Sequence, residues 1–157
     1  MQDMKDKVVL VTGGGTGLGA ATALGFARRG ANIVVNYASS ADAAADVAKQ
    51  CEALGVRAIA VQGDVAKDAD CRALVERTLS EFGRLDTLVN NAGTTKFADQ
   101  SDLDALEADD FLSIYRVNVV GVYQMVRAAR AALEASGAGA VVNISSIVGV
   151  MGIGSSM

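Results

Sequence analysis

Short apolar runs alternate with longer segments of helical periodicity along the whole chain. The apolar runs predict buried strands at residues 8–11, 33–35, 58–61, 85–89 and 140–144. Apolar residues at helical spacing predict helices over residues 18–29, 39–54, 71–82 and 111–133. Because a strand that is covered on both faces is apolar throughout, this alternation favours a parallel sheet between two layers of helices.

The connections between these elements sharpen the fold prediction. Right-handed crossovers convert the alternation into an α/β fold with a doubly wound parallel sheet, whose binding crevice lies at the carboxyl ends of the strands. Gly30 and Gly83 stand where helices commonly end. Ser39, followed three residues later by Asp42, has the spacing of a capping box at the start of the second helix.

Composition bounds the class of protein. The chain has 157 residues, of which 51% are hydrophobic and 20% charged, so we expect one folded domain rather than a disordered segment. The charge of −4 without a basic cluster argues against a nucleic-acid partner. No apolar run is long enough to span a membrane, and the charged first residues do not resemble a signal peptide. We therefore expect a cytoplasmic protein without a membrane partner.

Several kinds of catalytic site are excluded by residue content. Histidine is absent, and the only cysteines are Cys51 and Cys71, so neither a zinc site nor a Ser-His-Asp triad can be assembled. We predict no metal site, and we interpret the two cysteines as buried free thiols.

The clearest chemical signal follows the first strand. The segment Thr12-Gly13-Gly14-Gly15-Thr16-Gly17-Leu18-Gly19 leads directly into a helix. Glycines let the backbone approach a ligand closely, and the start of a helix offers unpaired N–H groups and a partial positive charge. This arrangement favours a bound pyrophosphate. A P-loop is excluded because no Lys-Ser or Lys-Thr closes the segment, and a glycine-rich turn without a ligand is the structural alternative.

The residues after the second strand bear on which dinucleotide would bind. An NAD-binding site usually carries an acidic residue at this point, which bonds the ribose 2′-hydroxyl. Here the segment reads Asn36-Tyr37-Ala38-Ser39-Ser40, with no acid before Asp42. A 2′-phosphate would meet no repulsion, and Ser39 and Ser40 could donate hydrogen bonds to it. We therefore predict NADP(H), with NAD(H) as the second choice.

The glycine segment also has the form T-G-x-x-x-G-x-G, and with it the chain resembles the short-chain dehydrogenase/reductase family from end to end. Asp64-Val65 looks like the family's adenine-contacting pair, and Asn90-Asn91-Ala92-Gly93 matches its N-N-A-G motif. Asn118 and Asn143-Ile144-Ser145-Ser146 match the positions of its catalytic asparagine and serine. The group of 3-oxoacyl-carrier-protein reductases and glucose dehydrogenases is the most similar.

This resemblance implies a Rossmann-like, NAD(P)-dependent oxidoreductase that transfers hydride between the cofactor and an alcohol or carbonyl. It implies that Ser146 and Asn118 are catalytic. The cofactor residues expected from the motifs together with the segment after the second strand are Thr12, Gly13, Gly15, Thr16, Gly17, Leu18, Gly19, Asn36, Tyr37, Ser39, Asp64, Val65, Asn91, Ala92 and Gly93. It also implies dimers or tetramers formed through the long helix that contains Asn118.

One expected motif does not occur. The family's catalytic Tyr-x-x-x-Lys is absent, and counting from Ser146 places its tyrosine just past Met157. We therefore expect residues 1–157 to be an incomplete dinucleotide-binding domain, whose last strands and substrate pocket belong to a C-terminal remainder. Tyr123 and Arg127 imitate the motif with a different base, but four-residue spacing on a helix is common in surface pairing, and we interpret them so.

Other interpretations of these residues stay open. Asp64 could cap the next helix, Asn91 could belong to a simple turn, and Ser146 could be a loop serine. Asn118 could be a structural amide, which needs partners if it is buried among its apolar neighbours. The protein could also be a nucleotide-binding module without catalysis or an inactive fragment of such an enzyme. A methyltransferase is disfavoured, because it would need an acidic residue where Thr12 stands.

Overall fold

The computed structural model describes residues 4–99, 101–102, 104–147 and 151. Its strands are β1 (Val8–Val11), β2 (Asn32–Tyr37), β3 (Ala58–Gln62), β4 (Thr87–Asn90) and β5 (Ala140–Asn143). They form one sheet in the order β3-β2-β1-β4-β5, and every neighbouring pair is parallel. The predicted doubly wound parallel sheet is confirmed.

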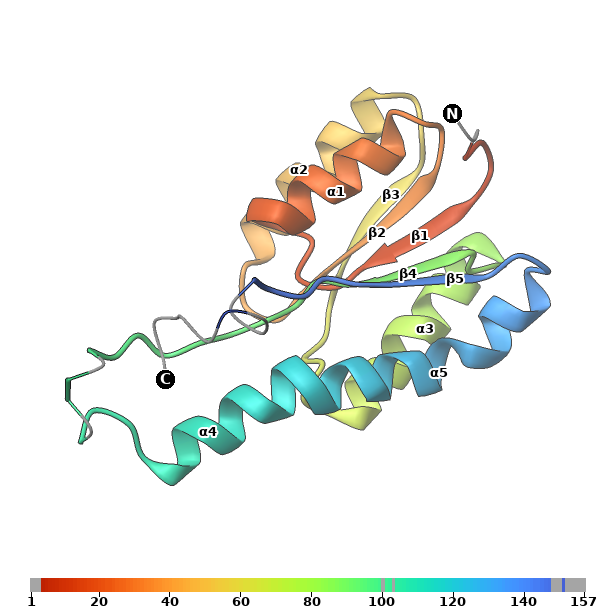
Figure 1. Cartoon of the computed structure of the whole chain (residues 1–157). Helices are drawn as coiled ribbons and strands as arrows, with labels where there is room; N and C mark the ends of the chain where they lie inside the picture. The colour runs from red at the N-terminus through yellow and green to blue at the C-terminus, as the bar shows by residue number, and fades with distance from the viewer. Residues whose placement is uncertain (1–3, 100, 103, 148–150, 152–157) are drawn as a thin grey trace.

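Helices cover both faces of this sheet. They are α1 (Gly17–Ala27), α2 (Ala41–Ala53), α3 (Asp68–Phe82), α4 (Ala108–Tyr115), the π-helical turn η1 (Arg116–Val120) and α5 (Gly121–Ala135). Figure 1 shows α1 and α2 on one face and α3 and α5 on the other, while α4 extends beyond the sheet. No helix in the described part of the chain is long and apolar enough to cross a lipid bilayer.

The core follows from the two-residue period of the strands. On β1, Val9 and Val11 pack in the cluster under α1 and α2, and Val8 and Leu10 pack in the cluster over α3 and α5. All four side chains are at most 1% exposed. Burying a side chain of this size contributes about 1.5–3 kcal/mol, so strands that are apolar on both faces stabilise both layers.

The predicted capping box at α2 is wrong. The residue that precedes the helix is Ser40 rather than Ser39, and its side chain makes no capping hydrogen bond. Because Ser39 lies one residue too early, it does not stand in register with Asp42 for a reciprocal cap.

The predicted long helix is not uniform. Its α-helical parts are separated by η1, a single π-helical turn that contains Asn118. Such turns are rare and are frequently found at functional sites.

The sheet is not covered equally along its width. Each residue of β1 and β4 is buried, whereas each residue of β5 is exposed. Helix α4 likewise has no buried residue. The compact core of the described structure therefore lies under β1 to β4.

Candidate functional site

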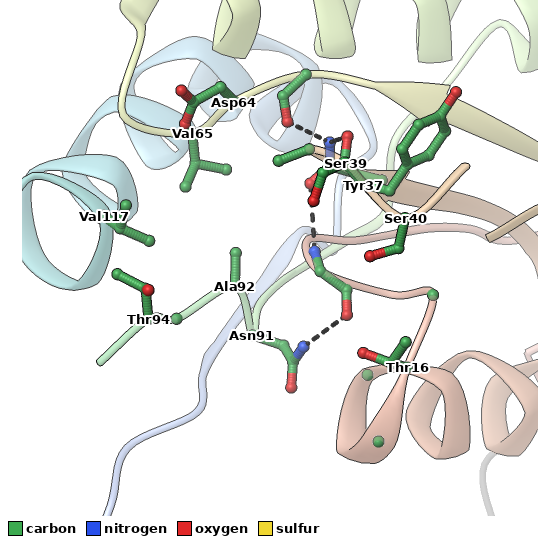
Figure 2. A pocket seen from close by; sticks show the side chains of 18 of the residues that line it. Thr16, Tyr37, Ser39, Ser40, Asp64, Val65, Asn91, Ala92, Thr94 and Val117 are labelled. Atoms are coloured by element: carbon green, nitrogen blue, oxygen red, sulfur yellow. Dashed lines mark hydrogen bonds between the residues drawn. The ribbon is translucent and has the colours of Figure 1, made fainter. Parts of the chain in front are cut away.

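A cavity of about 540 Å³ opens at the carboxyl ends of β1 to β4. Its lining consists of Gly13, Gly15, Thr16, Gly17, Leu18, Gly19, Asn36, Tyr37, Ala38, Ser39, Ser40, Gly63, Asp64, Val65, Asn91, Ala92, Gly93, Thr94, Ser113 and Val117. In Figure 2, Tyr37, Ser40 and Thr16 lie on one side of the cavity, and Thr94 and Val117 lie on the other. All the predicted cofactor residues except Thr12 meet here. This is the crevice that a doubly wound sheet is expected to form where the strand order changes direction.

The glycine loop between β1 and α1 is shaped by backbone constraints. Gly13 has a φ of +59°, in the left-handed region that favours glycine. A methyl group on Gly19 would collide with the carbonyl oxygen of Gly13 and come within 2.5 Å of Asn91 Nδ2. The helix therefore begins directly against the loop. Its first N–H groups have no partner within the helix, and its first turn carries no acidic residue.

Asn91 joins the glycine loop to the end of β4. Its Nδ2 donates to the carbonyl oxygens of Thr12 at 3.0 Å and Gly13 at 3.1 Å. The Thr12 hydroxyl oxygen in turn accepts the backbone N–H groups of Asn91 and Ala92, each at 3.0 Å. Asn91 is therefore more than a turn residue, because its amide fixes the distance between two walls of the cavity.

Thr12, also predicted as a cofactor-binding residue, does not line the cavity. It is 1% exposed, and its hydroxyl also donates to the carbonyl oxygen of Val89 at 3.3 Å. Because the residue is buried and its hydroxyl group bonds the backbone of Val89, Asn91 and Ala92, Thr12 joins the start of the glycine loop to the end of β4.

Asp64 and Val65 lie after β3, beside the same cavity. Asp64 Oδ1 accepts the N–H of Ala66 at 3.0 Å, and the Asp64 N–H donates to Asp70 Oδ2 at 2.9 Å. Helix α3 is preceded by Lys67, so Asp64 is not its cap. The turn holds Asp64 at the rim, 3.7 Å from Lys67 Nζ.

Asn118 holds Thr94, which is part of the cavity lining. Its Oδ1 accepts the N–H of Thr94 at 2.8 Å, and its Nδ2 donates to the Thr94 carbonyl at 2.9 Å. The residue is exposed rather than buried among its apolar neighbours, and its amide nevertheless has partners at both ends. Asn118 itself does not line the cavity, whereas its neighbour Val117 does.

Ser146 follows β5 and is exposed. It is not among the described residues that line the cavity. The structure thus gathers the predicted cofactor residues but does not bring Ser146 into the same lining.

The Tyr123 and Arg127 pair lies elsewhere, as the surface interpretation predicts. The Arg127 guanidinium stacks over the Tyr123 ring at 5.1 Å and bonds Asp68 on α3 at 2.6 Å. Hydrogen bonds from Arg127 and then Arg72 hold the pKa of Asp68 below its usual value. Neither Tyr123 nor Arg127 lines the cavity, and the pair instead ties α5 to α3.

The cysteines are the buried free thiols that the sequence predicts. Burial, with a smaller contribution from acidic neighbours, raises the pKa of Cys51 and of Cys71 to about 11. A thiol with so high a pKa is a poor nucleophile at neutral pH. Over the described ranges, no cluster of acidic or cysteine side chains could hold a metal ion.

Ala38, Gly63, Ser113 and Val117 line the cavity but were not singled out from the sequence. Gly63 directly precedes Asp64, so its position at the end of an apolar strand was a usable signal. Ser113 and Val117 are four residues apart and therefore share a helical face. Nothing in the sequence distinguishes that face as the one turned toward a ligand.

Comparison with known proteins gives this geometry a family context. A family model described as short chain dehydrogenase matches residues 7–157. An uncharacterized oxidoreductase of Methylorubrum extorquens is 43% identical over 148 residues, which is 94% of this chain and 58% of that protein. The 3-oxoacyl-acyl-carrier-protein reductase FabG of Staphylococcus epidermidis is 37% identical over 147 residues, again 94% of this chain and 59% of that protein. The chain thus spans somewhat under two thirds of the length of these curated relatives.

Solved structures include relatives with a bound cofactor. A short chain dehydrogenase from Burkholderia cenocepacia in complex with NADP superposes with a TM-score of 0.89 at 37% identity, over 99% of this chain and 62% of that one. An NAD⁺-bound xylitol dehydrogenase superposes with a TM-score of 0.89 at 30% identity, over 98% of this chain and 58% of that one. Relatives of this fold therefore bind NADP or NAD.

Proposed function

The chain belongs to the short chain dehydrogenase family, and from this premise we propose that the protein transfers hydride between NADP(H) and an alcohol or carbonyl substrate. One observation carries the proposal: a single cavity joins the glycine loop, the ends of β2 and β3, and the segment after β4. A dinucleotide is long enough to need all of these walls, whereas an isolated phosphate would need only the first.

The cavity fits an anionic dinucleotide chemically. Asp64 is the only charged residue in its described lining, so little negative charge opposes a pyrophosphate near α1. The start of α1 supplies N–H groups and a partial positive charge at the glycine loop. Asp64 and Val65 line the same cavity, and the family resemblance implies that they contact the adenine.

We assign the preference for NADP(H) to the segment after β2. Tyr37, Ser39 and Ser40 line the cavity there, and no acidic side chain of that segment does so. The two serine hydroxyls can donate to a 2′-phosphate, whereas a carboxylate would repel it. The NADP complex of the Burkholderia relative supports this choice, and the NAD⁺-bound xylitol dehydrogenase keeps NAD(H) as the second candidate.

The catalytic roles follow from the resemblance and from the geometry of Asn118. When bound, the nicotinamide supplies or accepts the hydride, and the chain has to hold the substrate and handle a proton. Ser146 is proposed to hydrogen-bond the substrate oxygen and stabilise its developing charge. Asn118 fixes the backbone of Thr94, a wall of the cavity, through both ends of its amide. The tyrosine and lysine expected for proton transfer do not occur as Tyr-x-x-x-Lys in these 157 residues.

We also propose that the protein forms a homo-oligomer through α4, η1 and α5. Phe111, Tyr115, Val119 and Tyr123 follow one another at four-residue spacing, and their side chains are 46–63% exposed. An exposed apolar stripe of this length is typical of a contact surface. Light scattering that gives the mass of a monomer at micromolar concentration would contradict the assembly.

The experiment that tests the proposed function begins with binding. NADPH and NADH are titrated against the protein by fluorescence, and oxidation of the preferred cofactor is then followed with a panel of ketones and 3-oxoacyl thioesters. We expect NADPH to bind more tightly than NADH and the Tyr37→Asp variant to reverse the order, because a carboxylate repels a 2′-phosphate and bonds a 2′-hydroxyl. Equal affinities in the unaltered protein would overturn the NADP(H) assignment. Because no Tyr-x-x-x-Lys occurs in these 157 residues, turnover is assayed with the intact gene product, and tight binding without turnover there would favour the alternative, a nucleotide-binding module without catalysis.

A further inference from the structure

Asn36 occupies an unusual place near the end of β2. Its residue is 2% exposed, and the side chain is the junction of three loops. Oδ1 accepts the N–H of Gly13 at 3.2 Å, and Nδ2 donates to the carbonyl oxygen of Gly63 at 2.9 Å. Longer contacts of 3.4 Å join Nδ2 to the carbonyl oxygens of Tyr37 and Val61.

The backbone of Asn36 strengthens this junction. Its carbonyl oxygen accepts the N–H of Gly14 at 2.8 Å, next to the Gly13 N–H that the side chain accepts. Asn36 therefore holds the first two glycines of the loop at two points.

We infer that Asn36 is a positioning residue, which sets the glycine loop against the ends of β2 and β3 rather than binding the cofactor itself. Its Oδ1 and Nδ2 are both engaged with the backbone and the residue is 2% exposed, so the amide is not presented to a 2′-phosphate. A buried amide with partners at both ends resists displacement, because an unmade bond in such a place is costly. The inference rests on the proposed function, namely that this cavity binds NADP(H).

A specific consequence follows from which part of the cofactor the glycine loop serves. The loop is proposed to hold the pyrophosphate, which NADPH and NADH share. Loss of the Asn36 amide should therefore weaken both cofactors in parallel and leave their affinity ratio unchanged. A residue that contacted the 2′-phosphate would instead weaken NADPH alone.

The main test variant is Asn36→Leu, which has a similar size and adds no charge. Asn32→Leu is the matched control, since Asn32 is on the same strand and its Oδ1 accepts the N–H of Arg57 at 2.9 Å, at the end of β2 away from the cavity. Asn36→Thr instead places a hydroxyl group there, which can both donate and accept a hydrogen bond. Thermal unfolding identifies the variants that fold, and Asn36→Thr supplies the comparison if Asn36→Leu does not.

Two measurements are made on each folded variant. Titration gives the dissociation constants of NADPH and NADH, and hydrogen exchange without cofactor gives the protection of the Gly13 N–H. For Asn36→Leu we expect both dissociation constants to rise about tenfold with a nearly constant ratio, the loss that follows one unmade buried hydrogen bond. We also expect faster exchange at Gly13, smaller changes in Asn36→Thr, and none at Gly13 in Asn32→Leu.

The outcomes separate this inference from the proposed function. Unchanged affinities and unchanged Gly13 exchange in a folded Asn36 variant would overturn the positioning role alone. A selective loss of NADPH affinity would overturn it in favour of direct contact with the 2′-phosphate. If the unaltered protein binds neither cofactor, the proposed function fails, and the inference fails with it.

Discussion

The two ends of the sheet are held together by different chemistry. At the amino end, a buried carboxylate joins the strands: Asp86 is 3% exposed and accepts the Val8 N–H at 2.9 Å. The same group is paired with Arg84 at 2.6 Å and with Lys7 at 3.2 Å. At the carboxyl end, the loops are held by the neutral amides of Asn36 and Asn91.

The difference shows how the end of the sheet that carries the cavity can be held together without adding charge. A buried carboxylate near the glycine loop would repel an anionic ligand, whereas a neutral amide joins backbone groups and leaves the positive end of α1 uncompensated. The amino end has no such constraint. There, burial alone would raise the pKa of Asp86, but hydrogen bonds from Arg84, the Val8 N–H and Lys7 outweigh it and hold the pKa below its usual value.

The largest effect on binding is expected from a change at the carboxyl end, Gly19→Ala. Its methyl group would collide with the Gly13 carbonyl, so the glycine loop has to move away from the start of α1. We expect NADPH affinity to fall at least about 30-fold, or about 2 kcal/mol, in fluorescence titration of the folded variant.

Gly25→Ala is the matched control on the same helix. A methyl group on Gly25 would meet no atom within 4 Å, so we expect unchanged cofactor affinity and a gain in helix stability. Unchanged binding by a folded Gly19→Ala variant would contradict the placement of the pyrophosphate.

An intermediate effect, on stability rather than binding, is expected from Asp86→Asn at the amino end. The amide cannot replace the charged partner of Arg84 and Lys7, so we expect the free energy of unfolding to fall by about 1–3 kcal/mol at neutral pH. Cofactor affinity should be unchanged, because Asp86 lies at the end of the sheet away from the cavity. Chemical denaturation and NADPH titration of the same samples measure the two quantities.

The stabilisation by Asp86 should depend on pH in a definite direction. Since folding lowers the pKa of Asp86, its stabilisation is fully present above the pKa of an unfolded aspartate, about 3.9, and is lost as the pH falls through the folded value. The difference in free energy of unfolding between the unaltered protein and Asp86→Asn should therefore narrow below about pH 4. Asp46→Asn, at an exposed position on α2, is the control. A gap that stays constant into acid would rule out the ionised carboxylate as its cause.

Much of this arrangement could be predicted from the sequence, because it depends on local pattern. The apolar runs predicted each of the strands in the described part of the chain, and the glycine loop was found from its place between an apolar run and a helix. The ends of the strands were predicted less well. Strand β2 runs from Asn32 to Tyr37, beyond the apolar run, because the backbone of Asn32 pairs with β1 and that of Tyr37 pairs with β3. The predicted cap at Ser39 failed because α2 begins one residue later, after Ser40, whose side chain makes no capping hydrogen bond.

The tertiary roles of the amides could not be predicted. The sequence singled out Asn36 only because it lies in the segment where an NAD-binding site usually carries an acidic residue. Its role in the fold instead depends on hydrogen bonds with Gly13 and Gly63, which are distant in sequence. The π-helical turn at Asn118 was equally hidden, because the same residues fit an α-helix locally. Its amide is satisfied by Thr94, a contact that only the packing of α4 and η1 against the segment after β4 creates.

The smallest expected effect tests whether the carboxyl end contains a part specific to NADPH. Gln62 Nε2 donates to the carbonyl oxygen of Ala38 at 3.1 Å and thereby tethers residues 38–40, which carry the serines proposed to hold the 2′-phosphate. Because this hydrogen bond is exposed, Gln62→Ala should weaken NADPH only about threefold and NADH less. Gln50→Ala is the control, since Gln50 makes a similar exposed bond to Asp46 on α2. Parallel titrations decide the point: an equal loss for both cofactors would mean that Gln62 acts on a wall that they share, and that the segment after β2 does not discriminate between them.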